Sequence, residues 1–374
     1  MQLSELGELG LLAELERRGL AQGIDHDAAQ LEGGVVATQD ALVEGVHFRL
    51  DRISWRDLGW RAAAVNLSDL AASGAEPEGL LVALGAPADT DVRNVIELYE
   101  GIAETKIYYV KVGGGNKEIW AMDYDGANQH PVTHLGTISI SPRISPDNSR
   151  LAFSSLGRNG FQIKVYSILL GRLLTFPEVG GTNVSPAWSP DGREIAYSSS
   201  RSGDPEIWIS DASGGSSRRV TSFRGPDVSP AFNPRTGNQI TWISGRTGLP
   251  QLYTMNTDGS GVQPMTDGGY ATSPSWSPNG QIIAFAWDRK YGPGAPGGQD
   301  IYVMEIATKK WIQLTHDSGR CDFPSWSPDG RHIVYASSPD GRPEHTRIWT
   351  MLADGTQRHA ITGPGADMPN WSWK

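Results

Sequence analysis

The chain has 374 residues, of which 38% are hydrophobic and 20% charged, an ordinary composition for a soluble protein with room for two domains. No apolar run approaches the roughly 18 residues of a membrane helix, and the single cysteine, Cys321, excludes an internal disulfide. The net charge is −10 and neither half of the chain has a dense basic stripe, so we expect neither a membrane span nor a nucleic-acid partner.

Composition changes sharply about 100 residues into the chain. Residues 1–104 hold 7 arginines, no lysine and 19 acidic residues, whereas the remainder is close to neutral. Of the 13 tryptophans, only Trp55 and Trp60 precede the first lysine, Lys106. We therefore predict one domain over residues 1–104 and a second over residues 105–374.

The first segment alternates between helical and extended patterns, which favours an α/β arrangement. We predict helices at Glu5–Arg18, Asp57–Ser73 and Val92–Glu104, and buried strands at Gly34–Thr38 and Leu80–Leu84.

Three stretches of this segment resemble the N-terminal part of the thiamine-monophosphate kinase family, which has a PurM-like fold. They are GIDHDAAQL (Gly23–Leu31), TQDALVEGVHF (Thr38–Phe48) and DLGWRAAAVNLSDLAASGAEP (Asp57–Pro77). The resemblance implies that Asp27, Asp40 and Asp69 stand where that family binds Mg²⁺ and ATP. It also implies that His47 lies where that family binds its phosphorylated substrate.

Two departures from the kinase pattern argue against activity. His26 occupies the place of one acid of an adjacent pair, and a neutral imidazole is a poor Mg²⁺ ligand. The resemblance also ends near Glu104, whereas phosphoryl transfer requires substrate, phosphates and metal to be positioned together. We expect an incomplete, non-enzymatic segment without cofactors, so that Mg²⁺ and ATP would matter only if the fragment acts as a kinase.

The rest of the chain repeats one phrase at a nearly fixed interval. The copies are SPRISPDN from Ser141, SPAWSPDG from Ser185, SPAFNPRTG from Ser229, SPSWSPNG from Ser273, FPSWSPDG from Phe323 and MPNWSW from Met368. Successive first prolines are 44, 44, 44, 50 and 45 residues apart. A period of this length with short β-like stretches predicts a propeller with four strands per blade.

One repeat shows the strands of a blade. We expect an inner strand at Ser185–Ser189, a Ser-Pro-Asp-Gly turn, and further strands at Arg193–Ser199, Glu206–Asp211 and Arg218–Ser222. The other Asp-Gly pairs also fall where hairpins are needed. They lack calcium-loop spacing, so we interpret them as turns rather than metal sites.

The repeat count predicts six blades, the last one assembled from both ends of the region. Met368–Lys374 would supply its inner strand, and Lys106–Lys111, Glu118–Asp123 and Gln129–His134 its outer strands. The 50-residue interval contains an insertion at Tyr291–Gly298, which is rich in glycine and proline and is predicted to be a loop. The fold class is thus mainly β, a six-bladed propeller preceded by an incomplete α/β segment.

The WSPDG blades, the run TKIYYVKVGGGNKEIWAMDYDGANQ (Thr105–Gln129) and the six-fold count resemble the C-terminal propeller of the TolB family. This resemblance covers about residues 102–374. It implies a binding propeller of the Tol–Pal system that docks the peptidoglycan-associated lipoprotein Pal at the mouth of its channel, alongside other Tol components. The implied partner-facing residues are Thr182, Asn183, Ser185, Val228 and Ser229, and by repeat symmetry Thr272 and Phe323. The family has a histidine in the first of these loops, and this chain has Thr182 in its place.

The resemblance and the N-terminus point to different compartments. TolB propellers work in the periplasm, in the cell envelope, and serve cell division. The first residues, however, lack the basic start and apolar core of a signal peptide, so the sequence as written predicts a cytoplasmic protein. WSPDG propellers also gate serine peptidases, but no Gly-x-Ser-x-Gly elbow occurs here.

Overall fold

The computed structural model describes residues 106–373 except 114, 169, 289–297, 317 and 318, together with residues 49, 55, 58, 59, 87, 90–95 and 98. The chain separates into two compact units, Met1–Thr105 with Lys374, and Lys106–Trp373. In the first unit, residues 55, 58, 59, 92–95 and 98 are helical, as expected for parts of the second and third predicted helices. The remaining predicted elements of this unit, and Asp27, Asp40, His47 and Asp69, lie outside the described residues.

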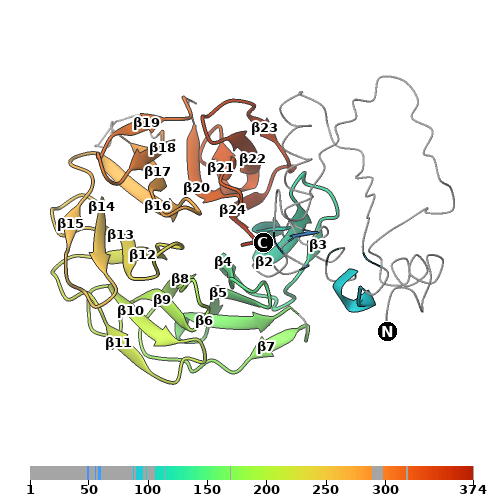
Figure 1. Ribbon diagram of the computed structural model, residues 1–374. Coiled ribbons are helices and arrows are strands. Elements are labelled where there is room, and N and C mark those ends of the chain that lie inside the picture. The colour runs from blue at the N-terminus through green and yellow to red at the C-terminus, as the bar shows by residue number, and fades with distance from the viewer. Residues whose placement is uncertain are drawn as a thin grey trace. The chain divides into compact units, whose positions relative to one another are not determined.

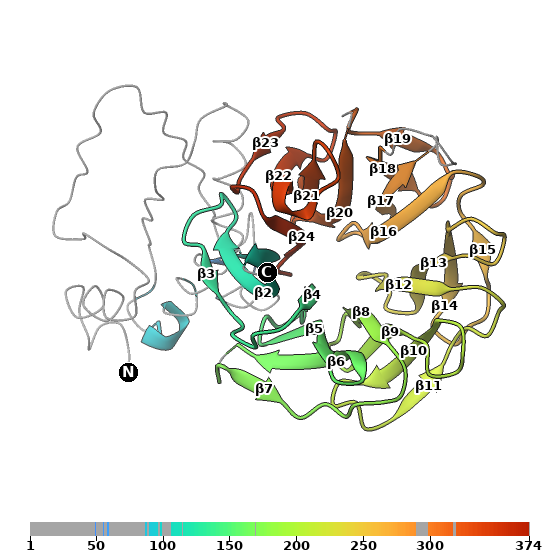
Figure 2. The ribbon, with the colours of Figure 1, turned by 180° about the vertical axis from the view of Figure 1, so that it is seen from behind.

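The second unit is a six-bladed β-propeller, as the repeat predicted (Figures 1 and 2). Each blade is a four-stranded antiparallel sheet whose innermost strand carries the repeated phrase. Blade 1 comprises β4 (Ser139–Ile144), β5 (Arg150–Gly157), β6 (Gly160–Ser167) and β7 (Arg172–Leu174). Blade 2 comprises β8 (Asn183–Trp188), β9 (Glu194–Ser199), β10 (Glu206–Asp211) and β11 (Ser217–Arg219). Blade 3 comprises β12 (Asp227–Phe232), β13 (Gln239–Ser244), β14 (Gln251–Asn256) and β15 (Gln263–Pro264).

The other three blades follow the same plan. Blade 4 comprises β16 (Tyr270–Trp276), β17 (Ile282–Asp288), β18 (Asp300–Glu305) and β19 (Trp311–Gln313). Blade 5 comprises β20 (Arg320–Trp326), β21 (His332–Ser338), β22 (Arg347–Leu352) and β23 (His359–Ala360), with the short 3₁₀ helix η1 (Pro343–His345) before β22. Blade 6 comprises β24 (Ala366–Trp371), β1 (Lys106–Gly113), β2 (Asn116–Asp123) and β3 (His130–Pro131).

Blade 6 closes the ring by joining the two ends of the unit. Strand β24 pairs antiparallel with β1, so that Ile107 lies opposite Trp371 and Val110 opposite Asp367. A backbone hydrogen bond of 2.9 Å from Ser372 N to the Lys106 carbonyl extends this pairing. Because β24 also contacts β4 of blade 1 and β20 of blade 5, the closing strand completes the circle. The predicted closure by the C-terminal copy is confirmed.

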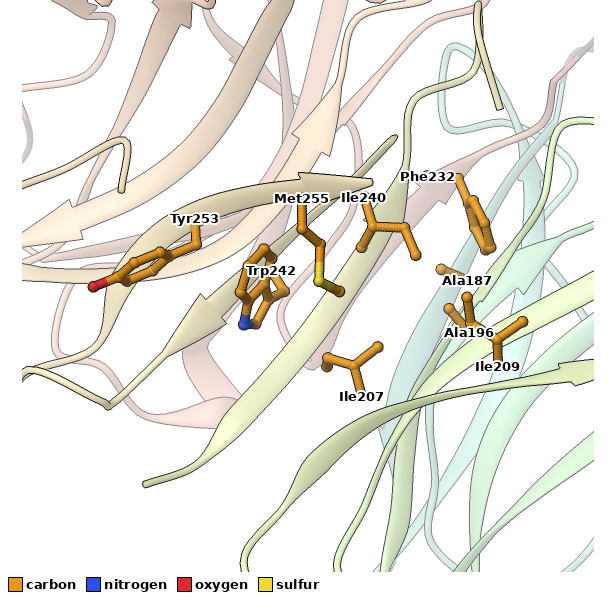
Figure 3. Packing of buried hydrophobic residues seen from close by; sticks show 9 residues of the cluster. All are labelled: Ala187, Ala196, Ile207, Ile209, Phe232, Ile240, Trp242, Tyr253 and Met255. Carbon is orange, nitrogen blue, oxygen red and sulfur yellow. The ribbon is translucent and has the colours of Figure 1, made fainter. Parts of the chain in front are cut away.

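Apolar side chains fill the spaces between neighbouring blades. Between blades 2 and 3, the side chains of Trp242, Met255 and Phe232 face those of Ile207 and its neighbours on the adjoining sheet (Figure 3). Both faces of a blade are therefore covered, and strands such as β9 are buried along nearly their whole length. Strands covered on both faces are buried in consecutive residues and not in every second one.

The outer strands are shorter than the sequence suggested. Strand β11 covers Ser217–Arg219 rather than Arg218–Ser222, and β3 is limited to His130–Pro131. An outermost strand pairs on one side only, so little holds its ends in the sheet. The insertion predicted at Tyr291–Gly298 lies outside the described residues, apart from Gly298.

Candidate binding surface and channel

The inner strands all run in the same direction along the central channel, which gives the propeller two distinct ends. We call the end where the inner strands begin the loop face; it includes residues 175–185, 220–229, 265–273, 319–323 and 361–368. We call the other end the turn face; it carries the Ser-Pro-Asp-Gly turns and their equivalents, residues 145–148, 189–192, 233–237, 277–280 and 327–330. In Figures 1 and 2, β4, β8, β12, β16, β20 and β24 lie nearest the centre.

Each inner strand contains the same bulge. In blade 2, Val184 pairs with Ser198 and Ala187 with Ala196, so Ser185 and Pro186 together oppose one residue. Ser185 has a φ of 57°, and the equivalent residues of the other blades have φ between 51° and 57°. Left-handed backbone is costly for side chains other than glycine. Proline suits the next position because it has no N–H to lose from the ladder.

The left-handed residues and their neighbours bring most of the predicted partner-facing positions together at the loop face. Thr182 is exposed, and Ser185, Val228, Ser229, Thr272 and Phe323 are half-buried. Thr182 is fixed to the next hairpin of its own blade, since its N–H donates to Ser200 Oγ at 2.9 Å. The backbone N–H of Ser185 donates to Ser154 Oγ of blade 1 at 3.1 Å.

Asn183 differs from the other predicted positions because its side chain is fully buried, with 0% exposed. Its Nδ2 donates to Gln162 Oε1 at 3.0 Å and to the Gly181 carbonyl at 3.1 Å. Asn183 therefore holds the loop before β8 in place. Without rearrangement it has no surface to offer a partner.

Thr272 and Phe323 belong to a charged network that the repeat alone did not reveal. Thr272 Oγ1 donates to Asp322 Oδ1 at 3.1 Å, and Arg320 contacts both Asp322 (2.9 Å) and Asp367 (3.8 Å). Burial raises the pKa of Asp367, an effect that Arg320 opposes. The Arg320 guanidinium also lies 5.1 Å from the centre of the Phe323 ring. Asp322 and Asp367 come from the inner strands of neighbouring blades and share Arg320, so this network joins blades 5 and 6 at the loop face.

Blade 3 carries a second buried ion pair at the same end. Asp227 is fully buried and accepts a contact of 3.2 Å from Arg246, whose side chain is 13% exposed. Arg246 also lies 4.9 Å from the centre of the Phe223 ring. Phe223 is 56% exposed, which is unusual for a phenylalanine in a loop.

Exposed apolar side chains are a further feature of the loop face. Leu156, Phe223 and Leu249 are among the exposed large hydrophobic residues, and each lies in or beside a loop-face connection. Sequence reasoning missed them. A large apolar residue between glycine and proline, as in GRTGLP (Gly245–Pro250), was the available signal.

A cavity lies toward the other end of the channel. It has a volume of about 270 Å³ and is lined by the second halves of all six inner strands and by turn-face prolines. Its polar lining residues are Arg143, Ser275, Ser325, Asn370 and Ser372, and its aromatic lining includes Trp188, Phe232, Trp276 and Trp326. None of the seven predicted partner-facing residues lines this cavity.

The turn face confirms the interpretation of the Asp-Gly pairs as turns. Ser189 Oγ donates to Asp191 Oδ1 at 2.6 Å and accepts from Glu194 N at 2.9 Å, while Gly192 has a φ of 67°. The hydrogen bond from Ser189 Oγ, together with one from the Arg193 N–H at 3.1 Å, holds the pKa of Asp191 below its ordinary value. Within the part of the chain that the structure describes, no group of three or more His, Cys, Asp or Glu residues is placed to hold a metal ion.

Comparison with known families follows the division into two units. The model of the TolB beta propeller domain matches residues 96–294 and 269–374. The chain belongs to the TolB beta-propeller family. A solved structure of TolB from Acinetobacter baumannii is similar, with a TM-score of 0.62 and 23% identity, covering 77% of this chain and 74% of that one. The Tol-Pal system protein TolB of Desulfosudis oleivorans is 35% identical over 80 residues, which are 21% of this chain and 18% of that protein.

The first unit resembles a different family. The N-terminal domain of AIR synthase related proteins matches residues 25–138. Thiamine-monophosphate kinase of Synechococcus elongatus is 44% identical over 104 residues, 27% of this chain and 32% of that protein. The chain spans 30–40% of the length of the curated kinases that it matches. The AIR synthase match overlaps β1–β3, which the structure places in blade 6 of the propeller.

Proposed function

We propose that this chain is a non-enzymatic, protein-binding propeller of the Tol–Pal system, which docks a Pal-like peptidoglycan-associated lipoprotein at its loop face. The observation that carries the proposal is a closed TolB-family propeller whose loop face presents the exposed Thr182 and Phe223. The periplasm is the compartment that fits this role.

The chemistry of the loop face favours a protein partner. Aromatic residues and arginine are over-represented among the side chains that dominate binding energy in protein interfaces. Here Phe323 packs beneath Arg320, and the exposed Phe223 packs against Arg246. The carboxyl oxygens of Asp322 and Asp367 beside Arg320 add hydrogen-bond acceptors for a basic side chain of the partner at the mouth of the channel.

A titration of the full chain with a purified Pal-like domain tests this proposal. We expect Phe323→Ala and Thr182→Arg to weaken the Kd at least tenfold, which corresponds to about 1.4 kcal/mol. Arg193→Glu is the matched control, because Arg193 lies beside the turn face with 86% of its side chain exposed. It should leave the Kd unchanged. The proposal would be contradicted if a folded propeller did not bind the domain. It would also be contradicted if the control variant lost as much affinity as the loop-face variants.

The kinase-like unit supports a second candidate function, phosphorylation of thiamine monophosphate, because of its 44% identity to a kinase. We propose that it is inactive, since only part of the kinase is represented and phosphoryl transfer needs all its groups positioned together. The full chain should release no ADP above background from ATP, Mg²⁺ and thiamine monophosphate. Substrate-dependent turnover would overturn the non-enzymatic assignment.

A further inference from the structure

One inner-strand position carries a charge in a single blade. The residue after the repeat proline is Ala187, Ala231, Ser275, Ser325 or Asn370 in blades 2 to 6, but in blade 1 it is Arg143. All six positions line the channel cavity. Arg143 is the one charged residue among the described residues that line it.

Among the described residues, no carboxylate lies within ion-pair distance of the Arg143 guanidinium. The one hydrogen bond of its side chain within that part of the chain runs from Nη1 to the carbonyl of the adjacent Pro142, at 2.8 Å. A guanidinium has five N–H donors in a fork that matches the two oxygens of a carboxylate or phosphate. Burial lowers the pKa of Arg143 to about 10, so the group remains charged at neutral pH.

Blades 4 and 5, which lie across the channel from blade 1, add hydrogen-bond donors to the cavity wall. Ser325 Oγ accepts from Trp371 N at 3.0 Å and from Asn370 Nδ2 at 3.4 Å, which leaves its hydroxyl hydrogen available to donate. Ser275 in blade 4 also lines the cavity with a hydroxyl. In blades 2 and 3 the corresponding residues, Ala187 and Ala231, have small side chains.

The surroundings strengthen a charged contact. Indole rings and prolines form most of the remaining wall, and an electrostatic interaction is stronger where such groups exclude bulk water. A volume of about 270 Å³ is small for a ligand site. At roughly 30 Å³ per water molecule it suits a small ion or a short acidic compound.

We propose that the channel binds a small oxyanion, a carboxylate or a phosphate group, between Arg143 and the hydroxyl groups of Ser275 and Ser325. This site lies toward the opposite end of the inner strands from the loop face. It therefore does not depend on the docking of a protein partner.

Titration of the full chain with sodium phosphate and, separately, with sodium succinate tests the site, with chloride used to hold ionic strength constant. Tryptophan fluorescence reports binding, because indole rings line the cavity. We expect saturation below about 10 mM for at least one anion. The anion whose titration shows saturable binding, phosphate or succinate, identifies the class of ligand.

Variants at position 143 assign the binding to the arginine. Arg143→Ala uses the residue that blades 2 and 3 already carry, and Arg143→Gln is a second neutral variant of similar length. Either folded variant should weaken the Kd at least tenfold, while Arg193→Ala should not change it. Equal affinity in a folded neutral variant, or no saturation of the wild-type chain by either anion, would overturn the proposal.

Discussion

The indole Nε1 of Trp188 in blade 2 donates a hydrogen bond of 3.0 Å to the backbone carbonyl of Arg143 in blade 1. The same link recurs from Trp276 to the Ala231 carbonyl and from Trp326 to the Ser275 carbonyl. In blades 2, 4 and 5 the tryptophan of the repeat therefore packs between blades and also joins its blade to the one before it. Phe232 occupies this position in blade 3 and has no N–H to donate.

Trp188→Phe should destabilise the propeller by about 1–3 kcal/mol, because a buried carbonyl loses its donor. Urea unfolding followed by circular dichroism measures this change. The reverse substitution, Phe232→Trp, is the matched comparison. It restores the donor found in other blades and should change stability by no more than about 1 kcal/mol, with any change favourable. An unaltered unfolding midpoint in Trp188→Phe would show that the indole hydrogen bond contributes nothing.

The buried Glu206 makes stability depend on pH. Burial raises the pKa of Glu206 above its ordinary value of 4.5, although Thr221 Oγ1 donates to its Oε2 at 2.5 Å. The protonated form is thus favoured in the folded state. The stabilisation from proton binding is complete below the unfolded-state pKa and is lost as pH rises through the folded-state pKa.

Glu206→Gln removes this dependence and has a natural precedent in blade 3, where Gln251 Oε1 accepts from Thr266 Oγ1 at 2.8 Å. The variant should match the wild type at low pH and be more stable at neutral pH. Unfolding free energies measured between about pH 3 and pH 8 test this. The exposed Glu344→Gln is the control. A variant less stable than the wild type at neutral pH would show that the carboxylate is net stabilising.

Arg246→Ala should lower the free energy of unfolding by about 3–5 kcal/mol, because it leaves the fully buried Asp227 carboxylate without its ion-pair partner. The double variant Asp227→Asn with Arg246→Ala should lose less stability than Arg246→Ala alone, since no uncompensated buried charge remains. Blade 2 carries Asn183 at the position equivalent to Asp227. Chemical denaturation of the wild type, Asp227→Asn, Arg246→Ala and the double variant gives the comparison. Strict additivity of the two substitutions would contradict a coupled pair.

Ser273→Val should destabilise the propeller by at least about 1–2 kcal/mol, because Ser273 has a φ of 51° and a β-branched side chain is strained there. Ser273→Gly is the matched control, since glycine adopts this backbone conformation without strain. Thermal unfolding separates the two variants. Similar melting temperatures for valine and glycine would show that the bulge relaxes at little cost.

Much of the propeller could be predicted from the sequence because its repeat encodes local geometry. The spacing of Pro142 to Pro369 indicated the blades, and the truncated last copy indicated how the ring closes. The ends of the outer strands could not be predicted, since edge strands such as β11 have little pairing to define them.

The binding surface was harder to predict because it depends on contacts between distant residues. Repeat symmetry placed Thr272 and Phe323 at the channel mouth, but it gave no sign that Asn183 is buried or that Phe223 is exposed. The network of Arg320 with Asp322 and Asp367 joins two blades, and a single repeat does not show it. Arg143 was visible as a departure from the small residues of the other copies, yet only the fold shows that it faces a cavity.

Hydrogen exchange of the full chain, with and without a saturating Pal-like domain, is the most direct measurement of the docking surface. We expect added protection at residues 182–185, 227–229, 271–273 and 321–323, with the turn at residues 189–192 unchanged. Protection confined to the turn face, or no protection at any of these segments, would contradict partner docking at the loop face.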